Sequence, residues 1–74
     1  MLQFHKIPNK RTTEYAIFDG PLIVGQILKV ETSRGKRGYC WDVSVTRSND
    51  PYPIGCDAET LYAAKVWAQS MRHA

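Results

Sequence analysis

The feature that most constrains the fold is a strictly alternating stretch at residues 39–47. Aromatic and β-branched residues alternate there with small and polar ones: Tyr39, Trp41, Val43 and Val45 against Cys40, Asp42, Ser44 and Thr46. Because successive side chains of a strand point to opposite faces, the pattern predicts a strand with one apolar face. We therefore expect Trp41 in the core.

Weaker patterns predict the strands around this one. Residues 22–33 are rich in β-formers and predict a long strand with apolar residues on both faces, in which Gly25 marks a bulge or bend. Residues 14–18 predict a strand that ends at the turn Asp19-Gly20-Pro21. Two shorter stretches, residues 2–7 and 54–56, are candidates for an N-terminal strand and a brief edge strand.

A helix is predicted at the end of the chain, over residues 57–72. Asp57 stands where an N-cap is expected, Glu59 falls in the first turn, and Arg72 falls in the last. At 100° per residue one arc contains five apolar residues that can pack on a sheet: Leu61, Ala64, Trp67, Ala68 and Met71.

These elements predict one α+β domain over residues 1–74. It consists of a basic N-terminal segment (1–13), a three-stranded antiparallel β-meander (14–47) and the C-terminal helix (57–72) packed on it. A fourth strand is added if residues 2–7 pair with the meander. With 74 residues the chain is shorter than the roughly 100–200 of a typical domain, so a second core is not expected.

Composition indicates the cellular compartment and the cysteine state that we expect for the protein. The apolar runs are far shorter than the roughly 20 residues of a spanning helix, and no apolar region follows the first basic residues, so we expect a cytoplasmic protein without a membrane segment. Cys40 and Cys56 are the two cysteines. They are expected to be reduced thiols, with a single bridge as the alternative.

The sequence does not predict an enzyme. The phosphate-binding, dinucleotide-binding and hydrolase motifs are absent, and His5, His73 and the two cysteines have no metal-ligand spacing. Cys40 and Asp42 share a strand face, but no histidine is placed to activate the thiol. We therefore expect no cofactor and no metal.

The strongest candidate binding segment is the basic connection between the two longest predicted strands. Arg34, Lys36 and Arg37 lie there in a glycine-rich hairpin, close to Tyr39 and Trp41. Cations beside aromatic rings suit contact with nucleic acid, and Lys65 and Arg72 on the helix could extend the basic surface. The alternative is a solvated turn whose charges prevent association at the sheet edge.

A second candidate is Tyr52, which lies between Pro51 and Pro53. A stiff aromatic loop can bind a protein at low entropic cost. The alternative is that Tyr52 folds back over the end of the core.

The order of the short motifs resembles that of small phage and prophage proteins. These motifs are Glu14-Tyr-Ala-Ile-Phe, Ile23-Val-Gly, Trp41-Asp-Val and Ile54-Gly-Cys-Asp-Ala-Glu-Thr-Leu. The resemblance covers residues 14–72 and implies a fold plan of a sheet followed by a helix.

Two functions follow as hypotheses. The first is a small binding protein, such as an accessory or inhibitor protein of a phage or mobile element, that occupies a surface of a larger macromolecule. The second is a nucleic-acid-binding module that uses Arg34, Lys36 and Arg37. We expect a protein partner before a nucleic acid. Because one sheet face stays uncovered by a single helix, we also consider a homodimer through that face or edge.

Overall fold

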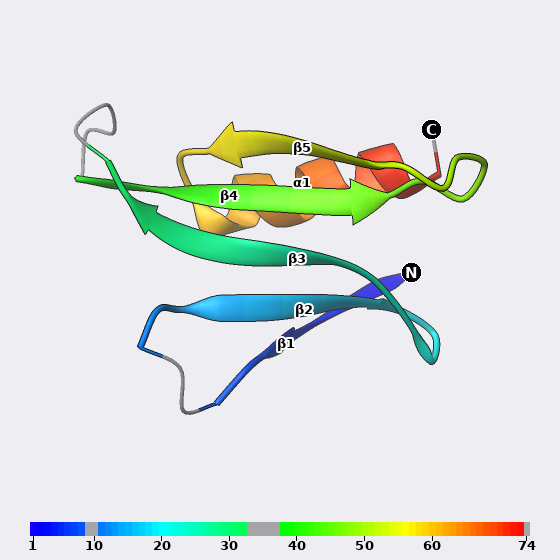
Figure 1. Cartoon of the computed structure of the whole chain (residues 1–74), viewed down its shortest axis with the longest axis horizontal. Coiled ribbons are helices and arrows are strands. Elements are labelled where there is room, and N and C mark those ends of the chain that lie inside the picture. Colours follow the sequence, from blue (N-terminus) through cyan, green and yellow to red (C-terminus); the bar gives the residue numbers. More distant parts are fainter. Residues whose placement is uncertain (9–10, 33–37, 74) are drawn as a thin grey trace.

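The computed structural model describes residues 1–8, 11–32 and 38–73. Within these residues the chain forms one antiparallel sheet and one helix (Figure 1). The elements are β1 (Leu2–Lys6), β2 (Glu14–Asp19), β3 (Leu22–Glu31), β4 (Tyr39–Thr46), β5 (Pro53–Ala58) and α1 (Leu61–Arg72). Each strand pairs with its predecessor in the chain, so the sheet is a meander with β1 and β5 at its edges.

The α+β class and the C-terminal helix are confirmed, but the predicted strand number is wrong. Five described strands replace the three or four expected from the sequence, and the meander extends beyond residues 14–47 at both ends. β1 confirms the candidate strand at residues 2–7, and β5 confirms and lengthens the brief edge strand considered at residues 54–56. Their pairing with β2 and β4 supplies the hydrogen bonds that keep them extended, and edge positions tolerate Pro53 at the start of β5.

The predicted start of the helix at Asp57 is also wrong. Asp57 belongs to β5, where it pairs with Asp42, and the N-cap is Thr60, whose side chain accepts a hydrogen bond from the Ala63 backbone N–H at 3.0 Å. Glu59 precedes the helix and does not lie in its first turn. Strand pairing with β4 competes with helix formation up to Ala58, and the next residue able to cap is Thr60.

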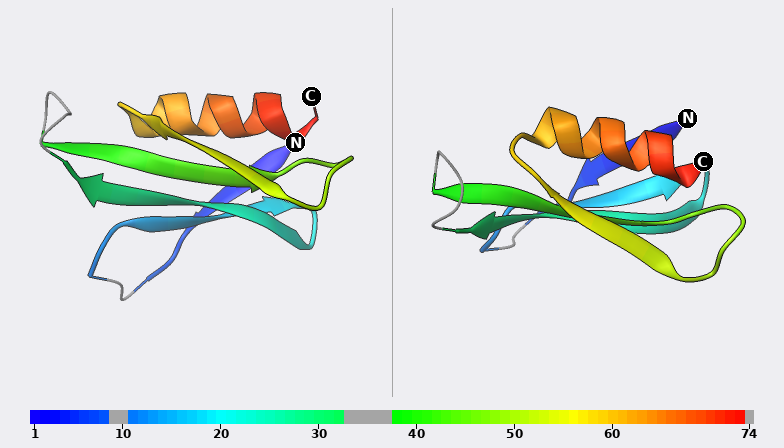
Figure 2. Two further views of the ribbon diagram at one scale, coloured as in Figure 1. Left: turned by 45° about the horizontal axis from the view of Figure 1, so that its top comes forward. Right: turned by 90° about the horizontal axis from the view of Figure 1, so that it is seen from above.

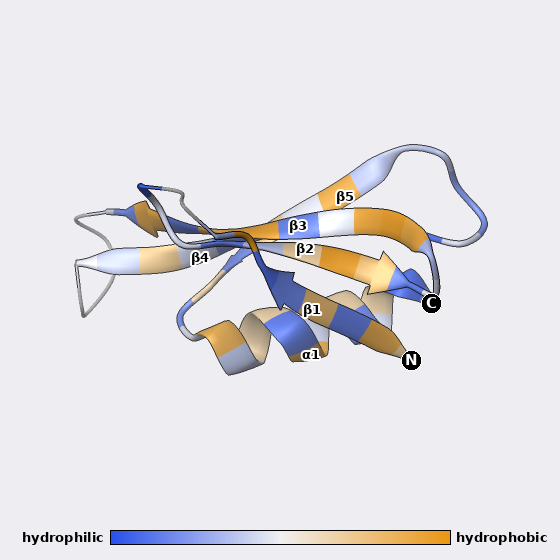
Figure 3. Ribbon diagram, turned by 90° about the horizontal axis from the view of Figure 1, so that it is seen from below, coloured by the Kyte–Doolittle hydropathy of each residue, from blue (hydrophilic) through white to orange (hydrophobic). Residues whose placement is uncertain are grey.

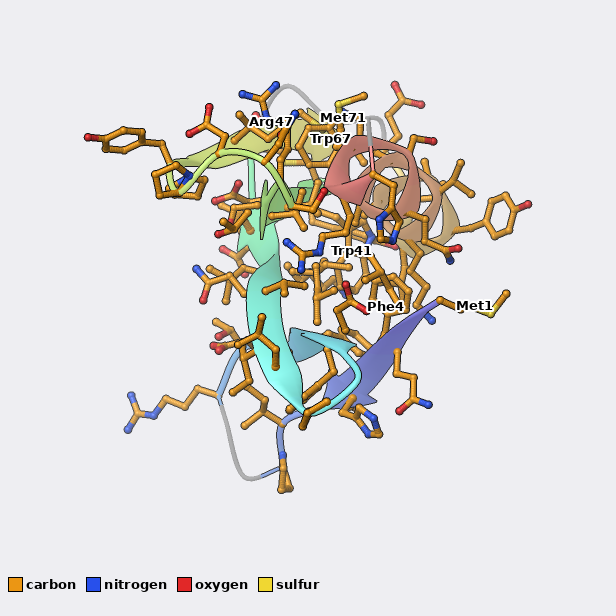
Figure 4. The ribbon with its side chains drawn as sticks, turned by 90° about the vertical axis from the view of Figure 1, so that its right-hand side faces the viewer. Met1, Phe4, Trp41, Arg47, Trp67 and Met71 are labelled. Carbon is orange, nitrogen blue, oxygen red and sulfur yellow. The ribbon has the colours of Figure 1, made fainter. Side chains whose placement is uncertain are left out.

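The helix packs on one face of the sheet, chiefly on β4 and also on β5 (Figure 2). Ala64 and Ala68 are fully buried, and the small side chains let α1 approach the strands closely. Leu61, Trp67 and Met71 pack around them, as the arc predicted. Trp41 is 8% exposed, which confirms it as a core residue. Figure 4 shows Phe4, Trp41, Trp67 and Met71 on the α1 side of the sheet.

A bulge in the β2–β3 pair changes which residues of β3 face the helix. Ile17 pairs with Gly25, but Phe18 pairs with Ile23, so Val24 is left over. Val24 is buried although simple alternation places it with the exposed side chains. The bulge expected at Gly25 is thus confirmed. A Cβ at Gly25 would overlap the Ser44 carbonyl oxygen, so β3 and β4 approach there more closely than a side chain permits.

The C-terminal end of α1 is tied to the sheet by Arg72. Its Nε donates to Asp19 Oδ2 at 3.0 Å, and its Nη1 donates to the Thr46 carbonyl oxygen at 2.8 Å. These two contacts join α1 to the β2–β3 turn and to the end of β4. In the described part of the chain, no helix is long and apolar enough to cross a membrane.

Candidate binding face of the sheet

The face of the sheet opposite α1, here called the open face, is covered by no described helix or strand (Figure 2). Register and alternation with the buried residues assign its side chains. They are Gln3, His5, Glu14, Ala16, Phe18, Ile23, Gln26, Leu28, Val30, Cys40, Asp42, Ser44, Thr46, Pro53, Gly55 and Asp57.

Part of the open face is apolar, mainly along β3. Ile23 is 63% exposed and Val30 is 40% exposed, and both lie on this strand with the half-buried Leu28 between them. Phe18 on β2 meets His5 on β1 edge to face, with ring centroids 5.2 Å apart. Figure 3 shows the apolar stretches along β3, with α1 on the other side of the sheet. The Ile23 and Val30 side chains both leave apolar surface exposed on this face, so the apolar strip is available to a partner.

The charged part of the open face is acidic. Asp42 and Asp57 are exposed and directly opposite each other on β4 and β5, and Glu14 lies in the same row across Leu28. Like charges directly opposite on neighbouring strands destabilise a sheet. The charges of the two aspartates also affect Cys56, whose side chain lies on the other face of the sheet. The pKa of the Cys56 thiol is raised by burial and further by the negative charges of Asp57 and Asp42.

The basic side chains of the described strands lie on the other face. Lys6 and Lys29 pair with Tyr15 and Trp41, so they point to the α1 side, and no lysine or arginine of the described strands points to the open face. The Lys29 ammonium lies 4.0 Å above the Tyr39 ring and 5.9 Å from that of Trp41. Among the described strands, the open face therefore carries carboxylates and no lysine or arginine, whereas the α1 side carries both signs of charge, with Asp19 and Glu31 as well as the two lysines.

Of the sequence-predicted basic residues, the structure describes Lys65 and Arg72. Arg34, Lys36 and Arg37 lie outside the described residues. Lys65 packs on the α1 side with its ammonium 5.5 Å from both the Phe4 and Tyr15 rings. Arg72 is held by Asp19 and Thr46 at the end of β4, whereas the predicted hairpin joins the start of β4. The two ends of β4 are seven strand residues, about 23 Å, apart.

Tyr52, the other predicted candidate, is 75% exposed and does not fold back over the core. The loop before it is ordered by Asp50, whose Oδ2 accepts from Arg47 Nη2 at 2.8 Å and whose Oδ1 accepts from the Tyr52 backbone N–H at 3.0 Å. The Tyr52 hydrogen bond, together with that of Arg47 and its charge, lowers the pKa of Asp50 despite some desolvation. Arg47, labelled in Figure 4, lies where β4 enters this loop.

The described histidines, cysteines and carboxylates form no candidate metal site. No three described His, Cys, Asp or Glu residues are grouped so that they could hold a metal. Cys40 and Cys56 are both free. Cys40 shares the open face with Asp42, whereas Cys56 pairs with Val43 and points to the α1 side, so the two thiols lie on opposite faces of the sheet.

Comparison of the chain with protein-family models, with curated proteins and with solved structures finds no match.

The open face was only partly foreseen. The sequence indicates that one sheet face stays uncovered, but the acidic row depends on the pairing of β4 with β5. The signal that could have found it is the spacing of Asp42 and Asp57 about the turn at residues 47–52, once residues 53–58 are read as a strand.

Proposed function

We propose that this protein is a non-enzymatic binding protein that occupies a surface of a larger protein through its open face. The observation that carries the proposal is the pair of exposed β-branched residues, Ile23 and Val30, on the face that α1 leaves uncovered. Exposed apolar patches rimmed by polar residues are typical of protein interaction sites.

The charges of the open face indicate which side chains the partner presents to it. The carboxylates of Asp42 and Asp57 stand beside the apolar strip, so a surface that presents Lys or Arg next to apolar side chains is complementary to it. The same carboxylates repel phosphate groups, which argues against nucleic acid on this face. The small size and the resemblance in motif order suit an accessory or inhibitor protein of a phage or mobile element.

The dimensions are compatible with a specific interface. The molecule measures 34 × 26 × 19 Å along its principal axes. A stable complex buries about 800 Å² on each partner, which is within reach of the broad side of such a sheet.

The proposal is tested by selecting a displayed library of random peptides on the immobilised protein. We expect enrichment of sequences that combine Lys or Arg with apolar residues. Binding of the selected peptides should be lost in Asp57→Lys, which reverses one charge on the open face. It should persist in Glu31→Lys, which makes the same change on the α1 side. Selected peptides that are acidic, or that bind Asp57→Lys equally well, would contradict the proposal.

A nucleic-acid-binding module is the second candidate, supported by the Lys29 ammonium above the Tyr39 ring at the start of β4. In this alternative the site is the basic segment with Arg34, Lys36 and Arg37. Titration with duplex DNA, single-stranded DNA and RNA at two salt concentrations decides it. Salt-sensitive binding that disappears when all three cations are replaced by Glu supports this candidate. Absence of binding at low salt removes it.

A further inference from the structure

We propose that the free edge of β5 accepts an extended basic segment of the partner protein as a sixth strand, with Tyr52 as its anchor. This inference rests on the proposed function and specifies how the partner is held.

The unpaired edge of the sheet is the first observation. β5 pairs with β4 on one side and has no described strand on the other. Pro53 lacks a backbone N–H, but along residues 54–58 the N–H and C=O groups of alternate residues point away from β4 and can take part in a further ladder. Addition of an extended segment to such an edge is a recurring mode of peptide recognition.

Charge distinguishes β5 from the other edge strand. β1 ends in Lys6 and is followed by Pro8, so this edge is basic and soon interrupted. β5 carries Asp57, has Asp42 directly beside it on β4, and is followed by the exposed Glu59. An extended segment with Lys or Arg is therefore attracted to β5 and repelled from β1.

The open-face side chains of β5 leave room for a cation. Gly55 separates Pro53 from Asp57 on this face, so no side chain stands between them. A Lys or Arg of an added strand placed opposite Asp57 completes a row of two carboxylates and one cation. This arrangement relieves the like-charge contact that the free protein maintains.

Tyr52 supplies a second contact at the beginning of the same edge. Figures 2 and 3 show that β5 begins, and the loop before it turns, on the side of the sheet away from α1. Pro51, Pro53 and the hydrogen bond from the Tyr52 N–H to Asp50 restrict the backbone on both sides of the ring. An exposed tyrosine on a restricted backbone is typical of residues that dominate interfaces.

The two contacts define the spacing of the partner segment. Tyr52 and Asp57 are five residues apart, which corresponds to about 17 Å of strand. An extended partner spans this distance with about five residues. The partner segment therefore has a Lys or Arg near one end and, about five residues away, an apolar or guanidinium side chain that packs on Tyr52.

A second copy of this chain fits the edge less well. Pairing of β5 with β5 brings two acidic edges together, and pairing of β5 with β1 leaves a free β5 and a free β1 at the ends, so the assembly does not close. A different protein is therefore the occupant that we infer.

The experiment follows the backbone amides of the full chain by NMR while a synthetic peptide of alternating lysine and valine is added. We expect shifts centred on Tyr52 and β5 and slower hydrogen exchange of the outward N–H groups of residues 54–58. A peptide with glutamate in place of lysine serves as the matched control and should not bind. Tyr52→Ala should weaken binding of the lysine peptide about tenfold, and Asp57→Lys should abolish it.

Four results would overturn the inference. Shifts confined to β2 and β3, with unchanged exchange in β5, would contradict the sixth strand and leave the proposed function standing. Equal binding of the glutamate peptide, or no binding of either peptide, would remove the basic partner segment. In that case the library selection still decides whether the open face binds protein. Protection of the β5 amides without peptide, lost on dilution, would identify a second copy as the occupant.

Discussion

Asp42 on β4 lies directly opposite Asp57 on β5, on the face of the sheet that α1 leaves uncovered. Two carboxylates in this relationship lower the stability of the free domain. Their presence beside exposed apolar residues links the local electrostatics to the proposed partner, because a cation of the partner relieves the repulsion.

Replacing one of these carboxylates by a cation should therefore stabilise the free protein. We expect Asp57→Lys to raise the free energy of unfolding by about 0.5 kcal/mol, since it converts a like-charge pair into an opposite-charge pair. Urea denaturation at low and high salt measures the effect, which should shrink as salt screens it. Glu31→Lys places its ammonium near Lys29 and should give no gain. Destabilisation by Asp57→Lys would show that the carboxylate has a structural partner.

The same variant should change the reactivity of Cys56. The charges of Asp57 and Asp42 contribute to the raised pKa of this thiol, so fewer thiolates are present at a given pH. Alkylation of Cys56 should become faster in Asp57→Lys than in the unchanged protein, as followed by mass spectrometry of the modified peptide. An unchanged rate would mean that burial, the larger cause, accounts for the whole shift.

The loop that carries Tyr52 should loosen in acid. The pKa of Asp50 in the folded protein lies below its ordinary value of 3.8. The contribution of the carboxylate is therefore present above about pH 4 and lost as the pH falls through the folded-state pKa. Amide exchange of Tyr52 should accelerate over this range. In Asp50→Asn it should be independent of pH there, after correction for intrinsic exchange rates. A Tyr52 amide whose exchange does not change as the Asp50 carboxylate becomes protonated would contradict the role of Asp50.

Gly25 should tolerate no side chain. The Cβ of an alanine would overlap the Ser44 carbonyl oxygen and approach the Val45 Cα to 2.9 Å, so the two strands must move apart. We expect Gly25→Ala to cost about 3 kcal/mol, judged from the cost of overpacking. Gly55→Ala meets Val43 O at 3.1 Å and should cost less. Thermal unfolding of both variants measures the two losses of stability. Equal losses would show that the strands at Gly25 move apart easily.

The side of α1 that packs on the sheet can also be tested. Ala68 is fully buried against the sheet, so Ala68→Asp places an unpaired carboxylate in the core and should unfold the domain. Gln69, the next residue, is exposed, and Gln69→Asp should leave the circular dichroism spectrum unchanged. A folded Ala68→Asp variant would contradict the packing of the helix.

Strong alternation made the central part of the fold predictable. β4 alternates without interruption, and the apolar arc of α1 identified the residues that contact the sheet. The burial of Val24 could not be read from alternation, because the bulge at Gly25 changes the phase of β3 by one residue. β1 and β5 are short and depend on their neighbours for pairing, so local pattern did not determine the extent of the sheet.

The candidate site was predictable in its parts and not as a whole. Tyr52 stands out because prolines flank it, and an uncovered sheet face follows from the presence of a single helix. That Asp42 lies opposite Asp57 can be predicted only when the pairing register of β4 and β5 is known. Reading Asp57 as a helix cap concealed it, since Asp is favoured at both a cap and a charged strand edge.

The most direct test of the central claim compares the peptides selected by the unchanged protein with those retained by Asp57→Lys. We predict that the unchanged protein selects basic, apolar sequences and that the variant loses them while it unfolds at higher urea concentrations. Retention of the same sequences by the more stable variant would contradict the proposal that the open face binds a basic protein segment.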